Sequence, residues 1–201
     1  MAREFRGCRK LVYAEVLTDN AEGITFGEVK TLAPVQEISK SVETSSEPKY
    51  YDNLAALIID AEGADTVAFT IAVPTDEVRA DIEGRVYDSA KKQYIEAPRA
   101  NKYFAVGYIY GETGEGEDEY CVWRYKGTFN IPDQTNATKN DGTDSNNMSL
   151  EFSGIYTTHE FANGGGTGKK ASAKSMRMKL GDVTEDKFFA QVTTPDTALS
   201  A

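Results

Sequence analysis

The chain has 201 residues, 40% of them hydrophobic and 10% aromatic, which suits one folded domain and excludes wholesale disorder. Its 32 acidic and 22 basic residues give a net charge of −10, which disfavours binding to nucleic-acid phosphates or to anionic membranes. One histidine and two distant cysteines, Cys8 and Cys121, provide no zinc cluster, and no apolar run is long enough to cross a bilayer. We expect a soluble protein made in the cytoplasm, without cofactor or metal, whose cysteines are free thiols or form one disulfide.

The first part of the chain predicts short strands separated by turns. Apolar and polar residues alternate over Leu11–Thr18 and Val35–Glu43, as expected for strands. The cluster Asp19–Gly23 favours a turn because Asp, Asn and Gly tolerate the dihedral angles that turns need. Ile24–Phe26 and Val29–Leu32 predict short extended pieces between these strands.

The polar stretch Thr44–Asn53 predicts a long loop or a projecting hairpin. Its last four residues are Tyr50, Tyr51, Asp52 and Asn53. Leu54–Asp60 and Asp65–Val73 then predict two strands around a turn at Ala61–Ala64. The second of these strands has the cleanest alternation in the chain, so we expect its larger side chains to face a core.

A short helix is predicted next, with local signals at both ends. Pro74 ends the preceding strand because proline cannot donate to a ladder. Thr75 is in position to cap a helix whose first turn carries two acidic residues. Val78 and Ile82 lie four residues apart and share one face, and Gly84 is the stop signal. The sequence therefore predicts a two-turn helix over Thr75–Gly84.

The remainder of the chain adds strands, loops and one more short helix. Extended segments are predicted at Arg85–Tyr87, Gln93–Ile95, Lys102–Tyr110, Tyr120–Phe129, Met148–Thr157 and Ser175–Leu180. Gly111–Glu119 predicts a solvated, mutually repelling acidic loop, and Thr184–Val192 predicts a final short helix. We expect a mainly β fold, sandwich or barrel-like, with a short flanking helix. It forms a single domain over 1–192, followed by a C-terminal tail over 193–201.

No segment predicts catalysis. His159 has no second histidine and stands beside a glycine-rich loop, which argues against nucleophilic catalysis. Gly164–Lys170 is similar to a phosphate loop, but Asn163 and Lys170 replace the glycine and the hydroxyl residue that this motif needs. Asp141–Asn147 lacks the glycine and the closing glutamate of a calcium loop. We therefore expect no enzymatic activity and no bound metal.

Aromatic residues gather in the two strands around the acidic loop. They are Tyr103, Phe104, Tyr108, Tyr110, Tyr120, Trp123 and Tyr125. Such rings are typical of cores and subunit interfaces, which is the interpretation we favour. A carbohydrate-binding face would use the same residues, so a carbohydrate-binding β-sandwich module is an alternative.

Three segments share their order and spacing with a known family. They are LVYAEVLTDNAEGITFGEV from Leu11, the signature Tyr50-Tyr51-Asp52-Asn53, and FTIAVPTDEVRADIEG from Phe69. The later KYFAVGYIYG and YCVWRYKGTF fit the paired central strands of that family. The chain resembles the major tail protein, the tail tube subunit, of long non-contractile-tailed bacteriophages.

The resemblance implies a β sandwich with a flanking helix, assembled into hexameric rings that stack into a hollow tube for DNA ejection. It implies that Glu43–Asn53, including Tyr50, Tyr51, Asp52 and Asn53, reaches the neighbouring ring as an inter-ring loop. The implied flanking helix carries Thr75, Val78 and Ile82.

The same resemblance implies partners and a location. The partners are further copies of the chain, a tape measure protein, and tail terminator and distal tail proteins. DNA passes through the lumen without specific binding, and no membrane is involved. The implied location is the virion tail, assembled in the host cytoplasm. A tube of a related secretion system or tail-like bacteriocin is a further alternative.

Overall fold

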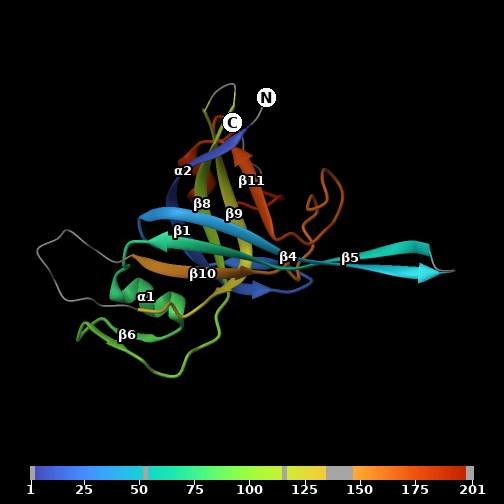
Figure 1. Ribbon diagram of the computed structural model, residues 1–201. Coiled ribbons are helices and arrows are strands. Elements are labelled where there is room, and N and C mark those ends of the chain that lie inside the picture. Colours follow the sequence, from blue (N-terminus) through green and yellow to red (C-terminus); the bar gives the residue numbers. More distant parts are fainter. Residues whose placement is uncertain (1–2, 52–53, 115–116, 135–146, 198–201) are drawn as a thin grey trace, which may run out of the picture.

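A computed structural model describes residues 3–51, 54–114, 117–134 and 147–197, with the backbone alone for 50, 51 and 54–60. The chain is mainly β, as the sequence predicts, and its strands form an antiparallel sheet accompanied by short helices. Figure 1 shows β8 and β9 running upright, while β4, β5 and β10 cross them. The sheet therefore wraps into a sandwich or barrel-like body, from which one hairpin projects.

The large sheet has nine strands, and the main path runs β2-β1-β8-β9-β10-β5-β4, with β3 beside β1 and β11 beside β9. Its strands are β1 (Glu4–Asp19), β2 (Ile24–Phe26), β3 (Lys30–Thr31), β4 (Val35–Tyr51), β5 (Leu54–Ile71), β8 (Phe104–Thr113), β9 (Glu117–Phe129), β10 (Met148–Gly154) and β11 (Ser175–Lys179). A small separate sheet pairs β6 (Val86–Asp88) with β7 (Gln93–Ile95). The helices are α1 (Asp76–Glu83) and α2 (Glu185–Phe189).

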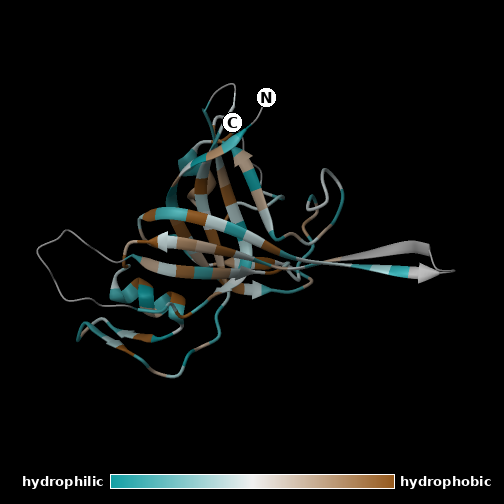
Figure 2. Ribbon diagram, viewed as in Figure 1, coloured by the Kyte–Doolittle hydropathy of each residue, from teal (hydrophilic) through white to brown (hydrophobic). Residues whose placement is uncertain are grey.

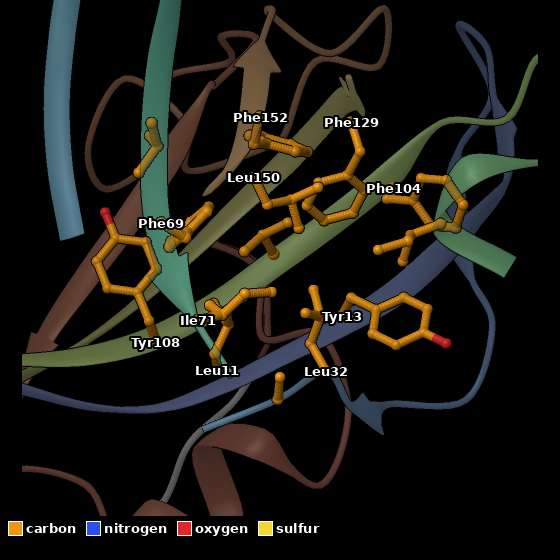
Figure 3. Packing of buried hydrophobic residues seen from close by; sticks show 14 of the residues in the cluster. Leu11, Tyr13, Leu32, Phe69, Ile71, Phe104, Tyr108, Phe129, Leu150 and Phe152 are labelled. Atoms are coloured by element: carbon orange, nitrogen blue, oxygen red, sulfur yellow. The ribbon is translucent and has the colours of Figure 1, made fainter. Parts of the chain in front are cut away.

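Side chains that alternate along β1, β8 and β9 pack into two separate hydrophobic cores, one on each face of these strands. Figure 2 shows the hydrophobic residues of these strands as brown bands. The first core lies between the upright and the crossing strands, and Figure 3 shows its rings and aliphatic side chains. Its largest fully buried members are Tyr13, Phe69, Phe104, Phe129 and Phe152. The second core covers the opposite face with C-terminal residues, among them Phe161, Phe188 and Phe189 packed near Trp123 and Tyr125.

The first core is enclosed because the sheet curls until β1 and β4 come side by side. The thiol of Cys8 in β1 contacts the carbonyl oxygen of Gln36 in β4 at 3.5 Å. The helix α1 adds Ile82, which is fully buried in the same core. Burial of this aromatic and aliphatic surface is the main force that holds the body together.

The predicted helix over Thr75–Gly84 is confirmed. The hydroxyl of Thr75 accepts a hydrogen bond from the backbone N–H of Val78 at 3.5 Å, and Gly84 ends the helix at φ 66°. A side chain at Gly84 would place its Cβ 2.2 Å from the carbonyl oxygen of Ala100. Glycine therefore satisfies both the left-handed conformation and the close approach of Ala100.

The turn predicted at Ala61–Ala64 is wrong. The strand β5 runs without interruption from Leu54 to Ile71, and its residues pair with β4 on both sides of Gly63. The sequence cluster Ala-Glu-Gly-Ala has turn-like composition, but a partner strand supplies its backbone hydrogen bonds instead. Likewise, 44–51 belongs to β4, so of the two predicted alternatives the projecting hairpin is the observed one.

The prediction of a free acidic loop over Gly111–Glu119 is also wrong. The first residues of this segment end β8 and its last residues begin β9, which pair with each other. The four described acids of this segment are also neutralised rather than mutually repelling, because basic residues of β1 and β11 face them. The ion pairs are Arg6–Glu117 at 2.9 Å, Arg9–Glu119 at 2.9 Å, Arg177–Glu112 at 3.2 Å and Lys179–Asp118 at 2.8 Å.

The C-terminal part packs onto the second core. The predicted helix at Thr184–Val192 is present over Glu185–Phe189, with Thr184 at its N-cap position. Thr193, expected as the start of a tail, is fully buried and donates to the carbonyl oxygen of Phe188 at 2.8 Å. Asp196 accepts hydrogen bonds from the backbone of the loop at 162–163.

Candidate assembly surfaces

The hairpin of β4 and β5 projects far from the body, and we call residues 43–51 and 54–64 the arm (Figure 1). The ladder from Thr44↔Glu62 to Tyr51↔Leu54 spans about 23–27 Å at the usual strand rise. Among the arm residues with described side chains, 43–48 and 61–63 are all exposed. The two strands of the arm pair with each other, and an isolated two-stranded hairpin is at best marginally stable in water.

Two of the four residues predicted as the inter-ring loop, Tyr50 and Tyr51, fall at the far end of this arm. The backbone of Tyr50 and Tyr51 ends β4, where they pair with Ala55 and Leu54. Asp52 and Asn53 lie outside the described residues. The return strand, which the sequence analysis assigned to a separate element, forms the other half of the arm.

Both long edges of the arm lack a strand partner within the described part of the chain. The strand β4 is the last one of the sheet, and β10 accompanies β5 only as far as the pair Gly154↔Asp65. Beyond Asp65, β5 pairs with β4 alone. Unpaired strand edges carry backbone N–H and C=O groups that can bind another chain.

The arm leaves the body at a buried ion pair. Asp65 and Arg124 are 2% and 4% exposed, and the guanidinium of Arg124 donates to the Asp65 carboxylate through Nη1. Arg124 Nε also donates to the hydroxyl of Tyr108 at 3.2 Å. Burial acts to lower the pKa of Arg124, but Tyr108 and Asp65 outweigh it and raise the pKa. Arg124 therefore stays charged, and its hydrogen bond to Asp65 links β9 to the foot of the arm.

A second clamp holds the arm from the side of β11. Lys174, just before β11, donates to Glu62 Oε1 at 2.7 Å and to the carbonyl oxygen of Gly63 at 2.6 Å. Its ammonium lies 4.5 Å from the ring centre of Tyr156. Hydrogen bonding to Lys174 lowers the pKa of Glu62. The two clamps fix the direction in which the arm leaves the body.

The flanking helix α1 is tied to the sheet by charged side chains as well as by Ile82. Asp81 accepts hydrogen bonds from Lys102 at 3.0 Å, Lys30 at 3.0 Å and Tyr13 at 3.0 Å. Of the three predicted helix residues, Ile82 is buried in the core, Val78 is half-buried against it, and Thr75 is the exposed cap. Ile82 and Val78 anchor the helix to the core.

Most of the aromatic side chains singled out in β8 and β9 are buried in the hydrophobic cores. Phe104, Tyr108, Trp123 and Tyr125 are at most 5% exposed. Of the remaining predicted rings, Tyr103 is 44% exposed and lies 5.0 Å from the Lys126 ammonium. Sugar binding by stacking needs accessible ring faces, so the buried rings are unavailable for it.

The residues weighed for catalysis are not assembled into a site. His159 packs edge-on against Phe161 at 5.2 Å between ring centres. Cys8 and Cys121 are free thiols, and burial raises the pKa of Cys121 to about 11, which opposes nucleophilic use. The loop at 141–147 lies outside the described residues except for Asn147. Within the described ranges, no three His, Cys, Asp or Glu side chains gather as a metal site.

Sequence reasoning missed Asp65, Arg124 and Lys174, the residues that hold the arm. Arg124 carried a usable signal, because it is a charged residue between Trp123 and Tyr125 in a strand otherwise rich in apolar, buried residues. Its partners are 59 residues away for Asp65 and 16 for Tyr108, beyond any local pattern.

Comparison with family models finds no match to this chain, and comparison with curated proteins finds none either. In the described part of the chain, neither helix is long and apolar enough to cross a membrane. By its fold and its surfaces, the chain is a mainly β protein with a projecting two-stranded arm that is held at its foot by two clamps.

Proposed function

We propose that this chain is the structural subunit of a bacteriophage tail tube, which assembles as hexameric rings stacked into a conduit for DNA ejection. The observation that carries the proposal is the arm. Its side chains at 43–48 and 61–63 are exposed, its edges have no strand partner among the described residues, and its foot is fixed by Asp65–Arg124 and Glu62–Lys174. A long arm held in one direction suits a subunit that must reach a neighbour at a set distance.

The rest of the molecule supports the same role. Heterologous contacts, in which the arm of one copy binds a different surface of the next, produce closed rings or open filaments without limit on copy number. The net charge of −10 disfavours adhesion of DNA phosphates, which suits a conduit. Partners that set length and close the ends, a tape measure protein with terminator and distal tail proteins, belong to this proposal.

Negative-stain electron microscopy of the purified protein at high concentration tests the proposal. We expect rods of constant width with an axial bore. Dispersed monomers at every concentration would refute it. A monomer that binds sugars on a glycan array would favour a carbohydrate-binding module instead.

An arm-deletion variant gives the matched experiment. Replacing 45–61 by Asn-Gly joins Thr44 to Glu62, residues that already pair, through a turn suited to hairpins. Because both clamps remain, we expect a folded monomer with an unchanged thermal transition that forms no rods. Normal rods from this variant would show that the arm is not needed for assembly.

A further inference from the structure

The two edges of the arm differ in how well they resist pairing. On β4, the arm carries Glu43, Glu47, Pro48 and Lys49, and the ladder shifts register between Val42 and Thr44. Charges, proline and bulges are the features by which natural edge strands avoid pairing with another chain. The β4 edge is therefore protected.

Over residues 54–59 the β5 edge lacks this protection, and its acids, Asp60 and Glu62, follow only after that run. Its first six residues, 54–59, are Leu-Ala-Ala-Leu-Ile-Ile, with no charge, proline or glycine. An uncharged aliphatic run on an unpaired strand is a strong template for an added strand. A chain that carries it on a projecting arm needs a partner strand to cover it.

The strand β11 offers a free edge on the body of the molecule. Lys174 and Leu180 lie opposite Tyr125 and Glu119 of β9 and are bonded to them, by Tyr125 N to Lys174 O at 2.9 Å and Leu180 N to Glu119 O at 2.7 Å. In an antiparallel ladder such bonded pairs alternate, so the even-numbered residues face β9. The backbone groups of Ser175, Arg177 and Lys179 therefore point away from it, where no strand accompanies β11 among the described residues.

The charges of the two segments are complementary. Residues 43–61 contain four acids, Glu43, Glu47, Asp52 and Asp60, against one base, Lys49. Residues 169–180 contain five bases, Lys169, Lys170, Lys174, Arg177 and Lys179, and no acid. Lys169 and Lys170 are exposed and make no ion pair within the described residues, so positive charge remains beside β11.

We infer that the β5 edge of the arm binds the outer edge of β11 on a second copy of this chain, adding a strand to that copy's sheet. The contact is heterologous, because the arm and β11 are different surfaces, so each copy gives one arm and receives another. This inference rests on the proposed self-assembly and names the surface that receives the arm. Backbone pairing would supply affinity, and the acid–base match would select the partner.

Cross-linking tests the contact directly. In a Cys8→Ser background, one preparation carries Ala61→Cys or Ala55→Cys in the arm, and the other carries Ser175→Cys beside β11. After mixing and treatment with a short bismaleimide, we expect a heterodimer band that each preparation alone does not give. Its absence from mixtures that form rods would overturn the β11 contact while leaving the tube proposal standing. A heterodimer without any rods would support the contact and refute the tube.

Two variants test the edge and the charges. Ser175→Pro removes an outward N–H but no bond to β9, so the fold should persist while the cross-link and the rods are lost. Persistence of the fold is read from the thermal transition and Trp123 fluorescence. Lys169→Glu/Lys170→Glu should also abolish assembly, and adding Glu43→Lys/Glu47→Lys should restore it. Lys91→Glu/Lys92→Glu, in the turn between β6 and β7, makes the same change of charge elsewhere and should leave assembly intact. Failure of the charge swap to restore rods, together with normal assembly of Ser175→Pro, would overturn the inference.

Discussion

Arg124 in β9 and Asp65 in β5 form a hydrogen-bonded ion pair at the point where the arm leaves the body, and both residues are almost completely buried. The pair joins strands that are not neighbours in the sheet, since β10 lies between them. Lys40 of β4 approaches the same carboxylate at 3.6 Å. One carboxylate thus joins β9 to both strands of the arm.

Asp65→Asn should destabilise the protein strongly, because it leaves the Arg124 charge buried without a counter-charge. We expect a loss of about 3–5 kcal/mol in the free energy of unfolding, measured by urea denaturation. Asp65→Asn/Arg124→Met should lose less than the Asp65→Asn variant, because no charge stays buried. The control Glu47→Gln breaks the exposed pair with Lys49 and should change stability by less than about 1 kcal/mol. Equal losses of unfolding free energy in Asp65→Asn and Glu47→Gln would mean that the buried ion pair contributes no more to stability than the exposed one.

Asp81 makes the stability of the protein depend on pH in the acidic range. Burial acts to raise the pKa of Asp81, but hydrogen bonds from Lys102 and Lys30, with a further one from Tyr13, outweigh it and hold the pKa below its usual range. The unfolded chain therefore binds this proton more readily than the folded one. The stabilisation is complete above the unfolded pKa of about 3.9 and is lost as the pH falls through the lower folded value.

Comparing the wild type with Asp81→Asn over pH 7 to pH 2.5 measures this contribution. The variant should be less stable at pH 7, and the difference in unfolding free energy should shrink as the pH falls below about 4. Asp19 shares the direction of the shift, because hydrogen bonds from Lys126 and from the backbone at 158–159 outweigh its burial. The contribution of Asp19 to the pH dependence is therefore present in both proteins and cancels in the difference between them. A difference that is constant over this range would show that the Asp81 charge does not contribute.

The helix α1 could be predicted from the sequence because its signals are local. Thr75 and Gly84 mark its ends whatever surrounds them, and both take the predicted cap roles. The arm could be predicted only in part. The composition of Ala61–Ala64 favours a turn, but pairing with β4 over the whole arm overrides it, and pairing between strands is not encoded in a short window.

The ion pairs of the surface likewise could not be predicted from short stretches of the sequence. Acids at 111–119 are close in sequence and suggest repulsion, yet Arg6 and Arg9, more than a hundred residues earlier, neutralise Glu117 and Glu119. The clamps of the arm are equally remote, with Lys174 and Glu62 separated by 112 residues. The sheet order brings these groups together, so their roles emerge only once the topology is known.

Gly84→Ala should destabilise the protein through its backbone and through a clash. The left-handed conformation at φ 66° alone costs roughly 1–2 kcal/mol for a residue with a Cβ. The clash with the carbonyl oxygen of Ala100 adds to this, because that oxygen belongs to a backbone held by the bond from Ala100 N to Gly84 O at 2.9 Å. Thr75→Ala, at the other end of the helix, should cost only about 1 kcal/mol. Thermal melts that rank the two variants in the opposite order would contradict this account of the caps.

Phe69→Pro and Val67→Pro should each abolish folding. Both residues are fully buried in β5 between two strands, where Phe69 pairs with Leu150 of β10 and with Ile38 of β4. Proline there removes a ladder hydrogen bond and leaves a buried partner group unsatisfied, in addition to emptying the volume of the original side chain. Phe69→Leu keeps the backbone donor and most of the apolar volume, so it should stay folded with lower stability. Far-ultraviolet circular dichroism and size-exclusion chromatography distinguish the two outcomes. A folded, monodisperse Phe69→Pro protein would show that β5 does not lie between β10 and β4.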